Sequence, residues 1–484
     1  MENQELFNKY QLRNEKSYNF LMHGIEILKT LLNRNYEAYI IGSAVRNLYL
    51  NQPSDSIEIV TNASNDVIKQ IFPSLIIDSY HNCYLNDANG RIYFSSFNQD
   101  EQEIINKNAE KYYNKKLTKV LQNKNFTIDS LALTPTLQVI DLFGGTADLD
   151  EMLIRTIDKP KGVFTTNSMV ILDALELVSH YGFDLYKKTL GAMIKASSHL
   201  DDVSEIDFIT QLRKILKGKY AKEVVELIND NQLFKYVHLY NVYINKIAKK
   251  FNQLTYLELI SILYLFIGKI PDAALFEDKE LQELTENITI AQLVASGVVT
   301  PMMVYNIGTD KLLSANQMAL LYKNNYSSQE RLIKKLERTA VISNIRELNF
   351  TKLELVNLLD GDRSIKIKII MNLLLEKVIN GEIINHNKIL KEEALKLNDD
   401  LKAIFEYTEP ILPVDYTEEV INELMKKYQK EFDFLVKVYL NDEKELYNLS
   451  ALERDEVINN AKMHAKTFLL ETSQYQILDE RGLI

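Results

Sequence analysis

The sequence predicts an α+β protein in which a small head of mixed strands and helices precedes a long all-helical remainder. Up to about residue 150, short apolar runs with a period of two alternate with runs that have helical spacing. After that point nearly every apolar pattern has the helical period. The chain contains only 8 Pro and 15 Gly in 484 residues, and this scarcity of helix breakers favours long helices.

The head elements follow from the local patterns. A short buried strand within 37–41 runs into a turn at Gly42, and a second turn is expected at Gly144 and Gly145. Alternating or continuous apolar runs predict the other strands, and i, i+3, i+4 spacing predicts the helices. We expect strands over 56–60, 91–97 and 138–143, and helices over 17–35, 45–50 and 65–71.

The remainder reads as helices joined by short connections. We expect them over 168–183, 185–200, 205–218, 221–232, 254–268 and 281–296. Residues 408–416 carry two prolines and predict a linker. Beyond it, 417–440 and 452–470 have the spacing of two amphipathic helices.

Composition and charge argue against a disulfide-bonded, zinc-binding or membrane-spanning protein. A single cysteine, Cys83, excludes an internal disulfide, and no Cys/His cluster has zinc-ligand spacing. The polar N-terminus is unlike a signal peptide, and no apolar run is long enough to span a bilayer, so we expect a cytoplasmic protein without a membrane partner. Of the net charge of −11, residues 401–484 carry −7, with 17 acids and 10 bases. The near-neutral remainder neither supports nor excludes RNA binding.

The order of elements in the head suggests nucleotide chemistry. A strand, a Gly-containing turn at Gly42 and Ser43, a helix and a strand with acidic character are arranged as in nucleotidyltransferases of the polymerase-β type. Such a turn lets backbone N–H groups approach a triphosphate. In those enzymes, two carboxylates separated by one residue lie on the same face of the next strand. They hold two divalent metal ions that activate a 3′-hydroxyl.

Several separated segments, in order, resemble class II CCA-adding tRNA nucleotidyltransferases and the related poly(A) polymerases. YIIGSAVRNLYLNQPSDSIEIVTNASNDVIKQIFP resembles their head signature of G-G-A-V-R-D followed by D-I-D-I-x-T, and KNFTIDSLAL resembles R-D-F-T-I-N-A-L-A. QVIDLFGGTADLDEMLIRT resembles the family's D-x-F-G-G-x-x-D-L-x-x-x-x-I-R-T stretch. Further similarity lies at 164–183, 212–216 and 378–390. The resemblance extends over about residues 20–395.

This resemblance implies a domain order. It places a nucleotidyltransferase-like head at 21–155, a helical neck at 156–235, a helical body at 236–340 and an RNA-binding-like tail at 341–400. An N-terminal extension (1–20) precedes these parts, and an acidic helical extension (401–484) follows them.

The chain departs from the family at the positions expected to do chemistry. Ser56 and Glu58 stand where the family has its two metal-binding aspartates, and serine is a poor magnesium ligand. Glu58 is therefore a doubtful catalytic candidate, and no metal site is assigned. The nucleotide-binding candidates are Gly42, Ser43, Arg46 and Lys124. Mg²⁺ with ATP or CTP would be cofactor and substrates only if the protein is active.

The neck departs further. The family uses an E-D-x-x-R set on a helix as a protein template for the incoming base, and here these residues are Thr166, Asn167 and Val170. Two further family arginines on that helix correspond to Asp173 and Glu176. Acids in place of arginines beside a triphosphate turn attraction into repulsion.

We therefore interpret the chain as a catalytically inactive member that binds tRNA or another RNA, or serves as a regulatory scaffold. Recognition of a phosphate backbone needs basic side chains rather than catalytic acids. The RNA-binding candidates are Arg213, Lys214, Lys217, Lys219, Arg363, Lys366 and Lys368. Two alternatives stay open: an active, diverged nucleotidyltransferase that uses Glu58, and a protein-interaction module whose partner binds 401–484. Oligomeric state and biological process are left open by the sequence.

Overall fold

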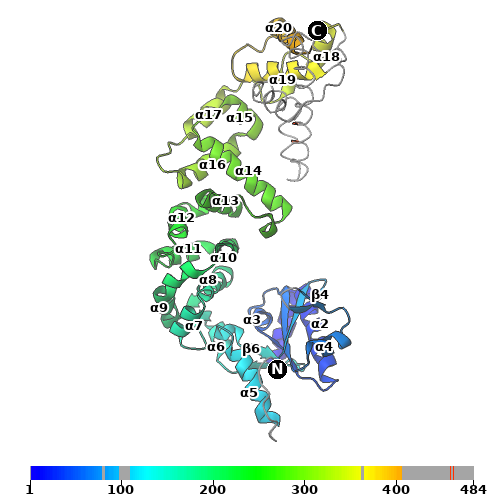
Figure 1. The fold of residues 1–484 in the computed structure, drawn as a ribbon, viewed down its shortest axis with the longest axis vertical. Helices are drawn as coiled ribbons and strands as arrows, with labels where there is room; N and C mark the ends of the chain where they lie inside the picture. Colours follow the sequence, from blue (N-terminus) through cyan, green and yellow to red (C-terminus); the bar gives the residue numbers. More distant parts are fainter. Residues whose placement is uncertain are drawn as a thin grey trace, which may run out of the picture. The chain divides into compact units, whose positions relative to one another are not determined.

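The computed structural model describes residues 2–78, 82–96, 109–360 and 365–405, together with the isolated positions 458 and 462. The chain divides into two compact units, Met1–Lys249 and Lys250–Ile484. Each unit is described by itself. Figure 1 shows the strands gathered in the N-terminal part of the first unit, while the chain after them is helical.

The head is built on a seven-stranded mixed sheet with the order β3-β4-β5-β2-β1-β6-β7. β2 and β5 pair in parallel, and all the other neighbours pair antiparallel. The strands are β1 (Ala38–Ile41), β2 (Ser56–Thr61), β3 (Ile76–Ile77), β4 (Cys83–Asp87), β5 (Gly90–Ser96), β6 (Leu131–Leu133) and β7 (Val139–Asp141). The predicted α+β class is confirmed.

Helices cover both faces of this sheet. Gly24 of α2 lies so close to the sheet that a Cβ there would come within 3.0 Å of Ile40 and 3.2 Å of Ile57. The alternate face carries Ile41 and Val60, which pack against buried leucines of α5. The head helices are α1 (Glu2–Arg13), α2 (Glu15–Leu32), α3 (Ser43–Leu50), α4 (Asn65–Ile71), α5 (Ala109–Gln122), the 3-10 turn η1 (Thr127–Asp129) and α6 (Gly145–Asp150).

The rest of the first unit is helical apart from a two-strand ladder. That ladder joins β8 (Leu153–Ile154) to β9 (Asp184–Leu185) in parallel. The helical elements are α7 (Pro160–Thr166), α8 (Met169–Tyr181), α9 (Lys187–Ala196), η2 (Ser197–Asp202), α10 (Glu205–Lys217), α11 (Ala221–Asp230) and α12 (His238–Ala248). α8 packs against both α10 and α11, and α7 against α9.

In the described part of the second unit, the elements are helical. Capping boxes begin two of the helices, at Thr255 with Glu258 and at Thr351 with Glu354. A core of buried side chains joins the last three helices. The elements are η3 (Phe251–Gln253), α13 (Tyr256–Ile267), η4 (Ala273–Leu275), α14 (Asp278–Ala295), α15 (Pro301–Ile307), α16 (Thr309–Tyr322), α17 (Glu330–Thr339), η5 (Ile345–Glu347), α18 (Lys352–Leu358), α19 (Ile365–Ile379) and α20 (Asn387–Phe405).

Every head strand and helix predicted from the sequence is present within a few residues of its expected bounds, as are the six helices expected between 168 and 296. The linker at 408–416 and the helices expected over 417–440 and 452–470 lie outside the described residues. The finer division into head, neck, body and tail stays a prediction. Among the described helices, none combines the length and apolar character needed to cross a membrane.

One glycine makes a testable contribution to the packing of α10 against α8. A Cβ at Gly218 would lie 2.1 Å from the Ser179 hydroxyl and 2.6 Å from its backbone, so Gly218→Ala must push α10 away from α8. We expect a loss of about 1–3 kcal/mol in unfolding free energy, measured by denaturant titration. Gly191→Ala is the matched control, because its Cβ would meet nothing within 4 Å inside α9 and should stabilise by about 0.5–1 kcal/mol. Equal effects of the two substitutions would contradict this packing.

Candidate functional site

The expected phosphate-binding turn is present at the end of β1. Gly42 has φ of +77° and ψ of −138°, a conformation that L side chains rarely adopt, and α3 begins at Ser43 immediately after it. In the sheet, Ile41 pairs with Glu58 of β2. This register brings the turn and the one acidic side chain of β2 to the same end of the sheet.

Three of the predicted residues meet at this turn. The Lys124 ammonium donates to Glu58 Oε2 over 2.6 Å, and the two side chains are 24% and 38% exposed. A Cβ added at Gly42 would lie 3.5 Å from Glu58 Oε2 and 3.6 Å from Lys124 Nζ. The ion pair therefore lies directly against the backbone that would have to approach a phosphate.

The residues at the metal position do not fit magnesium. Ser56 and Glu58 are both half-buried and share a face of β2, as their spacing predicts. They offer one neutral hydroxyl and one carboxylate that already accepts from an ammonium, whereas Mg²⁺ prefers several charged or carbonyl oxygens. Within the described residues, no group of three or more His, Cys, Asp and Glu side chains is placed to hold a metal ion.

The Arg46 side chain makes its contacts with other residues of the protein. Its guanidinium is buried, forms an ion pair with Asp129 and lies 5.0 Å from the ring centroid of Tyr181. Asn47 completes the link: its Oδ1 accepts from Tyr181 Oη over 3.0 Å, and its Nδ2 donates to the Pro53 carbonyl over 2.9 Å. Arg46 thus joins α3 of the head to the C-terminal turn of α8, and its role in nucleotide binding stays a prediction.

Sequence reasoning missed the partners of Arg46. Asp129 is the one acid in the segment 124–133, and its place between the apolar residues Ile128 and Leu131 was a usable signal, because an acid among apolar residues needs a cation. Tyr181 gave no comparable signal. Its ring reaches Arg46 only because the last turn of α8 meets α3 in the folded chain.

The template positions are separated by the fold. Thr166 and Asn167 are exposed where α7 ends, and the Asn167 side chain accepts from the Met169 N–H over 3.1 Å. Val170 lies on α8, and its side chain is completely buried in the hydrophobic core. These three residues offer no set of groups that could pair with one base.

The two acids that follow on α8 form a local cluster. Gln211 of α10 donates its amide N–H groups to Asp173 over 2.6 Å and to Glu176 over 3.0 Å, and Lys214 lies 3.7 Å from Glu176. Burial and then the negative charge of Glu176 raise the pKa of Asp173 to about 6, against the opposing effects of Lys214 and Gln211. Gln211 was not foreseen as the residue that holds this pair.

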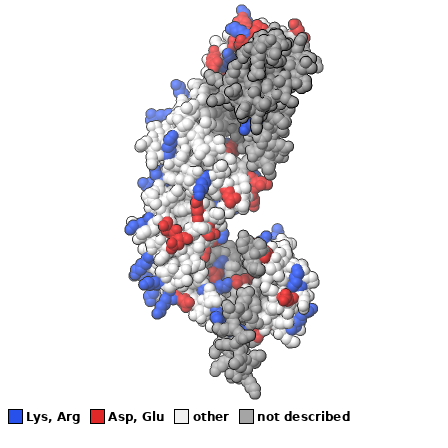
Figure 2. All heavy atoms as spheres, viewed as in Figure 1, with Lys and Arg blue, Asp and Glu red and all other residues white. Residues whose placement is uncertain are grey.

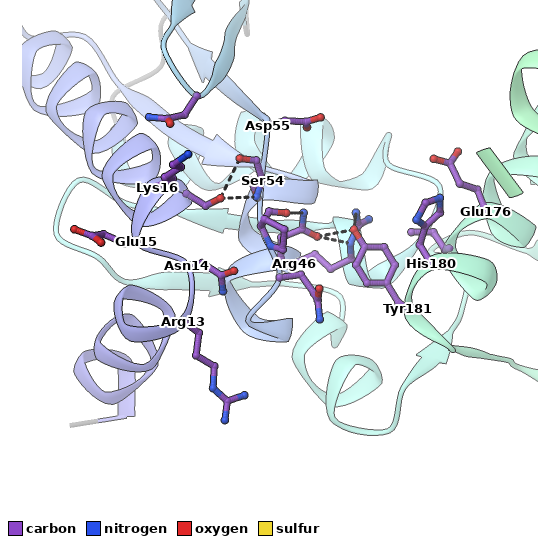
Figure 3. A pocket seen from close by; sticks show the side chains of 16 residues that line it. Arg13, Asn14, Glu15, Lys16, Arg46, Ser54, Asp55, Glu176, His180 and Tyr181 are labelled. Atoms are coloured by element: carbon purple, nitrogen blue, oxygen red, sulfur yellow. Dashed lines mark hydrogen bonds between the residues drawn. The ribbon is translucent and has the colours of Figure 1, made fainter. Parts of the chain in front are cut away.

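A polar pocket of about 800 Å³ lies beside this cluster, within the first unit. Figure 3 shows that it is framed by the turn between α1 and α2, by α3, by the segment before β2 and by α8. Arg13 and Lys16 contribute positive charge, while Asp55 and Glu176 contribute negative charge. Its lining does not include Gly42, Glu58 or Lys124, so it is separate from the turn.

The predicted RNA-binding residues are distributed over both units. Lys217 and Lys219 are exposed at the end of α10, whereas Lys214 is drawn to Glu176. Arg213 is half-buried. Lys366 and Lys368 are half-buried on α19, and Arg363 lies outside the described residues. Their contact with RNA stays a prediction.

The stretch 138–156 owes its pattern to the fold. Asp141 accepts N–H bonds from Gly144, Gly145 and Thr146 and so holds the start of α6. Asp148 accepts from Thr127 and Arg155, which joins η1 to the residue that follows β8. The retained motif residues therefore position one element against another.

The raised pKa of Asp173 gives a prediction of pH dependence. Because the carboxyl ionises at a higher pH in the folded than in the unfolded chain, its contribution to stability is lost as the pH rises from about 4 to about 6. Asp173→Asn should raise the unfolding free energy by about 1–3 kcal/mol at pH 7.5 and change it little at pH 4. Denaturant titrations at both pH values check this, with the exposed Asp184→Asn as the control. A gain of the same size at both pH values would contradict a titrating Asp173.

Comparison with known proteins supports the same fold. Residues 38–155 match the poly A polymerase head domain. The CCA-adding enzyme of Geobacillus sp. (strain WCH70) is 25% identical over 393 residues, covering 77% of this chain and 96% of the relative. That of Bacillus subtilis (strain 168) is 24% identical over 382 residues, covering 76% and 96%.

Solved structures of CCA-adding enzymes align with this chain. The Thermotoga maritima CCA-adding enzyme complexed with tRNA_CCA aligns with a TM-score of 0.55 and 18% identity, covering 81% of this chain and 98% of that one. The Bacillus stearothermophilus CCA-adding enzyme in complex with CTP aligns with a TM-score of 0.50 and 20% identity, covering 78% and 98%. The matched head domain, the similarity over nearly the whole length of these relatives and the alignment with their solved structures all point to the class II CCA-adding enzymes and poly(A) polymerases as the proteins that this chain resembles.

Proposed function

We propose that this CCA-adding-enzyme-like protein binds tRNA and that metal-dependent nucleotide addition has been lost. The observation that supports the loss is the ion pair of Glu58 with Lys124 beside Gly42, with Ser56 in place of a second carboxylate. A magnesium ion at this place would have to displace an ammonium group and would gain one carboxylate.

The size of the expected loss follows from what is missing. Removing one interaction that stabilises a transition state commonly costs about 3–4 kcal/mol, a rate factor of hundreds. Here a metal ligand, the template side chains and the positive charge opposite a triphosphate are all altered. Since such groups act together, their separate losses are not additive. Asp173 and Glu176 add negative charge on α8, which opposes a bound triphosphate.

The tRNA partner is proposed from the relatives. Proteins with this fold include a CCA-adding enzyme complexed with tRNA_CCA. Recognition of a phosphate backbone needs no metal and no template, so binding can outlast catalysis. The cytoplasmic location expected from the sequence stays a prediction, as does a protein partner for 401–484.

A second candidate is an active nucleotidyltransferase. It is favoured by the similarity to CCA-adding enzymes, which covers 96% of the length of the Geobacillus relative, and by the presence of an acid next to the glycine turn. In this case Glu58 would hold the metal after Lys124 moves to the triphosphate. This candidate predicts that Glu58 is essential.

Nucleotide incorporation separates the two candidates. The protein is incubated with tRNA lacking its 3′ CCA, with Mg²⁺ or Mn²⁺ and with labelled CTP and ATP. We expect no extension above that of Glu58→Ala, because the metal position is incomplete. Incorporation that vanishes in Glu58→Ala but persists in the exposed control Glu226→Ala would overturn the proposed loss and establish the active enzyme.

Binding to tRNA is measured independently of incorporation. We expect the wild-type protein and Glu58→Ala to bind the same tRNA equally well, because the metal position contributes nothing to backbone contacts. Affinity should fall as salt is added, since each phosphate contact releases counterions. Fluorescence anisotropy with labelled tRNA at several salt concentrations provides the measurement. An affinity that does not change with salt would argue against recognition of the backbone.

A further inference from the structure

Five lysines gather on two neighbouring helices of the neck. Lys159 and Lys161 lie at the start of α7, and Lys187, Lys188 and Lys195 lie on α9, which packs against α7. All five side chains are exposed. Figure 2 shows Lys and Arg side chains gathered on the side of the first unit where α9 lies. We call these five residues the α7–α9 face.

The two helices of this face carry positive charge alone. Neither α7 nor α9 contains an acidic residue. The exposed acids that flank them in sequence lie outside both helices, Asp158 and Asp184 before them and Asp201 and Asp202 in η2 after α9. Within the described part of the chain, none of the five ammonium groups forms an ion pair. Because the whole chain has a net charge of −11, this local excess is not a consequence of its composition.

The fold does not need these charges where they are. α9 begins with Lys187 and Lys188 and has no side-chain cap, although the helix dipole favours acids in the first turn. Lysines there oppose the dipole and lower the stability of the helix. Their ammonium groups also hold no neighbouring element, so packing gives no reason for their positions.

The surroundings of the lysines fit a phosphate backbone better than a protein. Ile194, 38% exposed, is the one large apolar side chain that reaches the surface on α9, whereas protein interfaces need an apolar centre. Gly162 and Gly191 leave open space where side chains would otherwise stand. Lysine acts as a point charge on phosphate oxygens and carries no base preference.

We propose that the α7–α9 face binds the sugar–phosphate backbone of RNA, independently of base sequence. The proposal rests on the proposed tRNA binding and adds a contact surface on the neck, apart from the basic residues expected on α10 and α19. Under this proposal, α7 and α9 hold RNA through the positive charge of their lysines, without side chains that pair with a base.

The test replaces Lys161, Lys187, Lys188 and Lys195 by Gln in the full-length protein. The matched control replaces Lys9, Lys29, Lys119 and Lys235 by Gln, four exposed lysines elsewhere in the first unit. Binding is measured against three probes: tRNA lacking CCA, an RNA hairpin of unrelated sequence and polyglutamate. We expect the test variant to lose tenfold or more in affinity for both RNAs and the control less than threefold. The slope of log affinity against log salt should fall by about 0.7–0.9 per phosphate contact removed.

A second variant guards against misfolding. Lys187→Glu with Lys188→Glu should raise the unfolding midpoint, because acids suit the start of α9, and should still weaken RNA binding. Equal RNA affinity of the test and control variants would overturn the proposal, as would wild-type binding to polyglutamate in preference to RNA.

The two proposals fail in different ways. If the wild-type protein binds the unrelated hairpin through the α7–α9 face but shows no preference for tRNA, the proposed tRNA binding is wrong and the proposed RNA-binding role of the α7–α9 face is retained. If the wild-type protein binds neither RNA, both are overturned.

Discussion

The buried guanidinium of Arg46 is the constraint on which the geometry of the first unit depends. A charge taken out of water must be paired and hydrogen-bonded, and Asp129 of η1 provides the opposite charge. Asn47 and Tyr181 complete its surroundings. Because these groups come from α3, from the segment before β6 and from α8, satisfying Arg46 fixes the head sheet against the neck. Loss of one partner would leave a buried charge uncompensated.

Two other acids that match the family's pattern also make contacts that stabilise the fold. Asp141 holds the start of α6, and Asp148 holds Arg155 at the connection to the neck. These family-like residues are retained, and each has a structural contact. The positions that the resemblance assigns to a metal, a base or a triphosphate hold Ser56, Val170 and Asp173 instead. The proposed loss of nucleotide addition rests on these positions, whereas Asp141 and Asp148 are explained by the contacts they make in the fold.

The charged side chains of α7, α8 and α9 differ in whether they are paired within the protein. On α8, Gln211 and Lys214 hold the acids Asp173 and Glu176 within the protein. On α7 and α9 the positive charge faces solvent. A surface of this kind attracts a polyanion over its whole length but cannot choose a base, since base choice needs hydrogen bonds in a fixed geometry.

By itself the sequence determined the fold class and the local elements, because strand and helix periods are properties of neighbouring residues. The glycine turn at Gly42 and the shared face of Ser56 and Glu58 followed from local pattern and spacing, whereas the altered template positions followed from the resemblance to the family. The tertiary structure decided which charges meet. Lys124 reaches Glu58 across 66 positions, and Arg46 reaches Tyr181 across 135. The α7–α9 face likewise appears only when two helices more than twenty residues apart pack together. Electrostatic partners depend on distance in space, and no local pattern in the sequence records that distance.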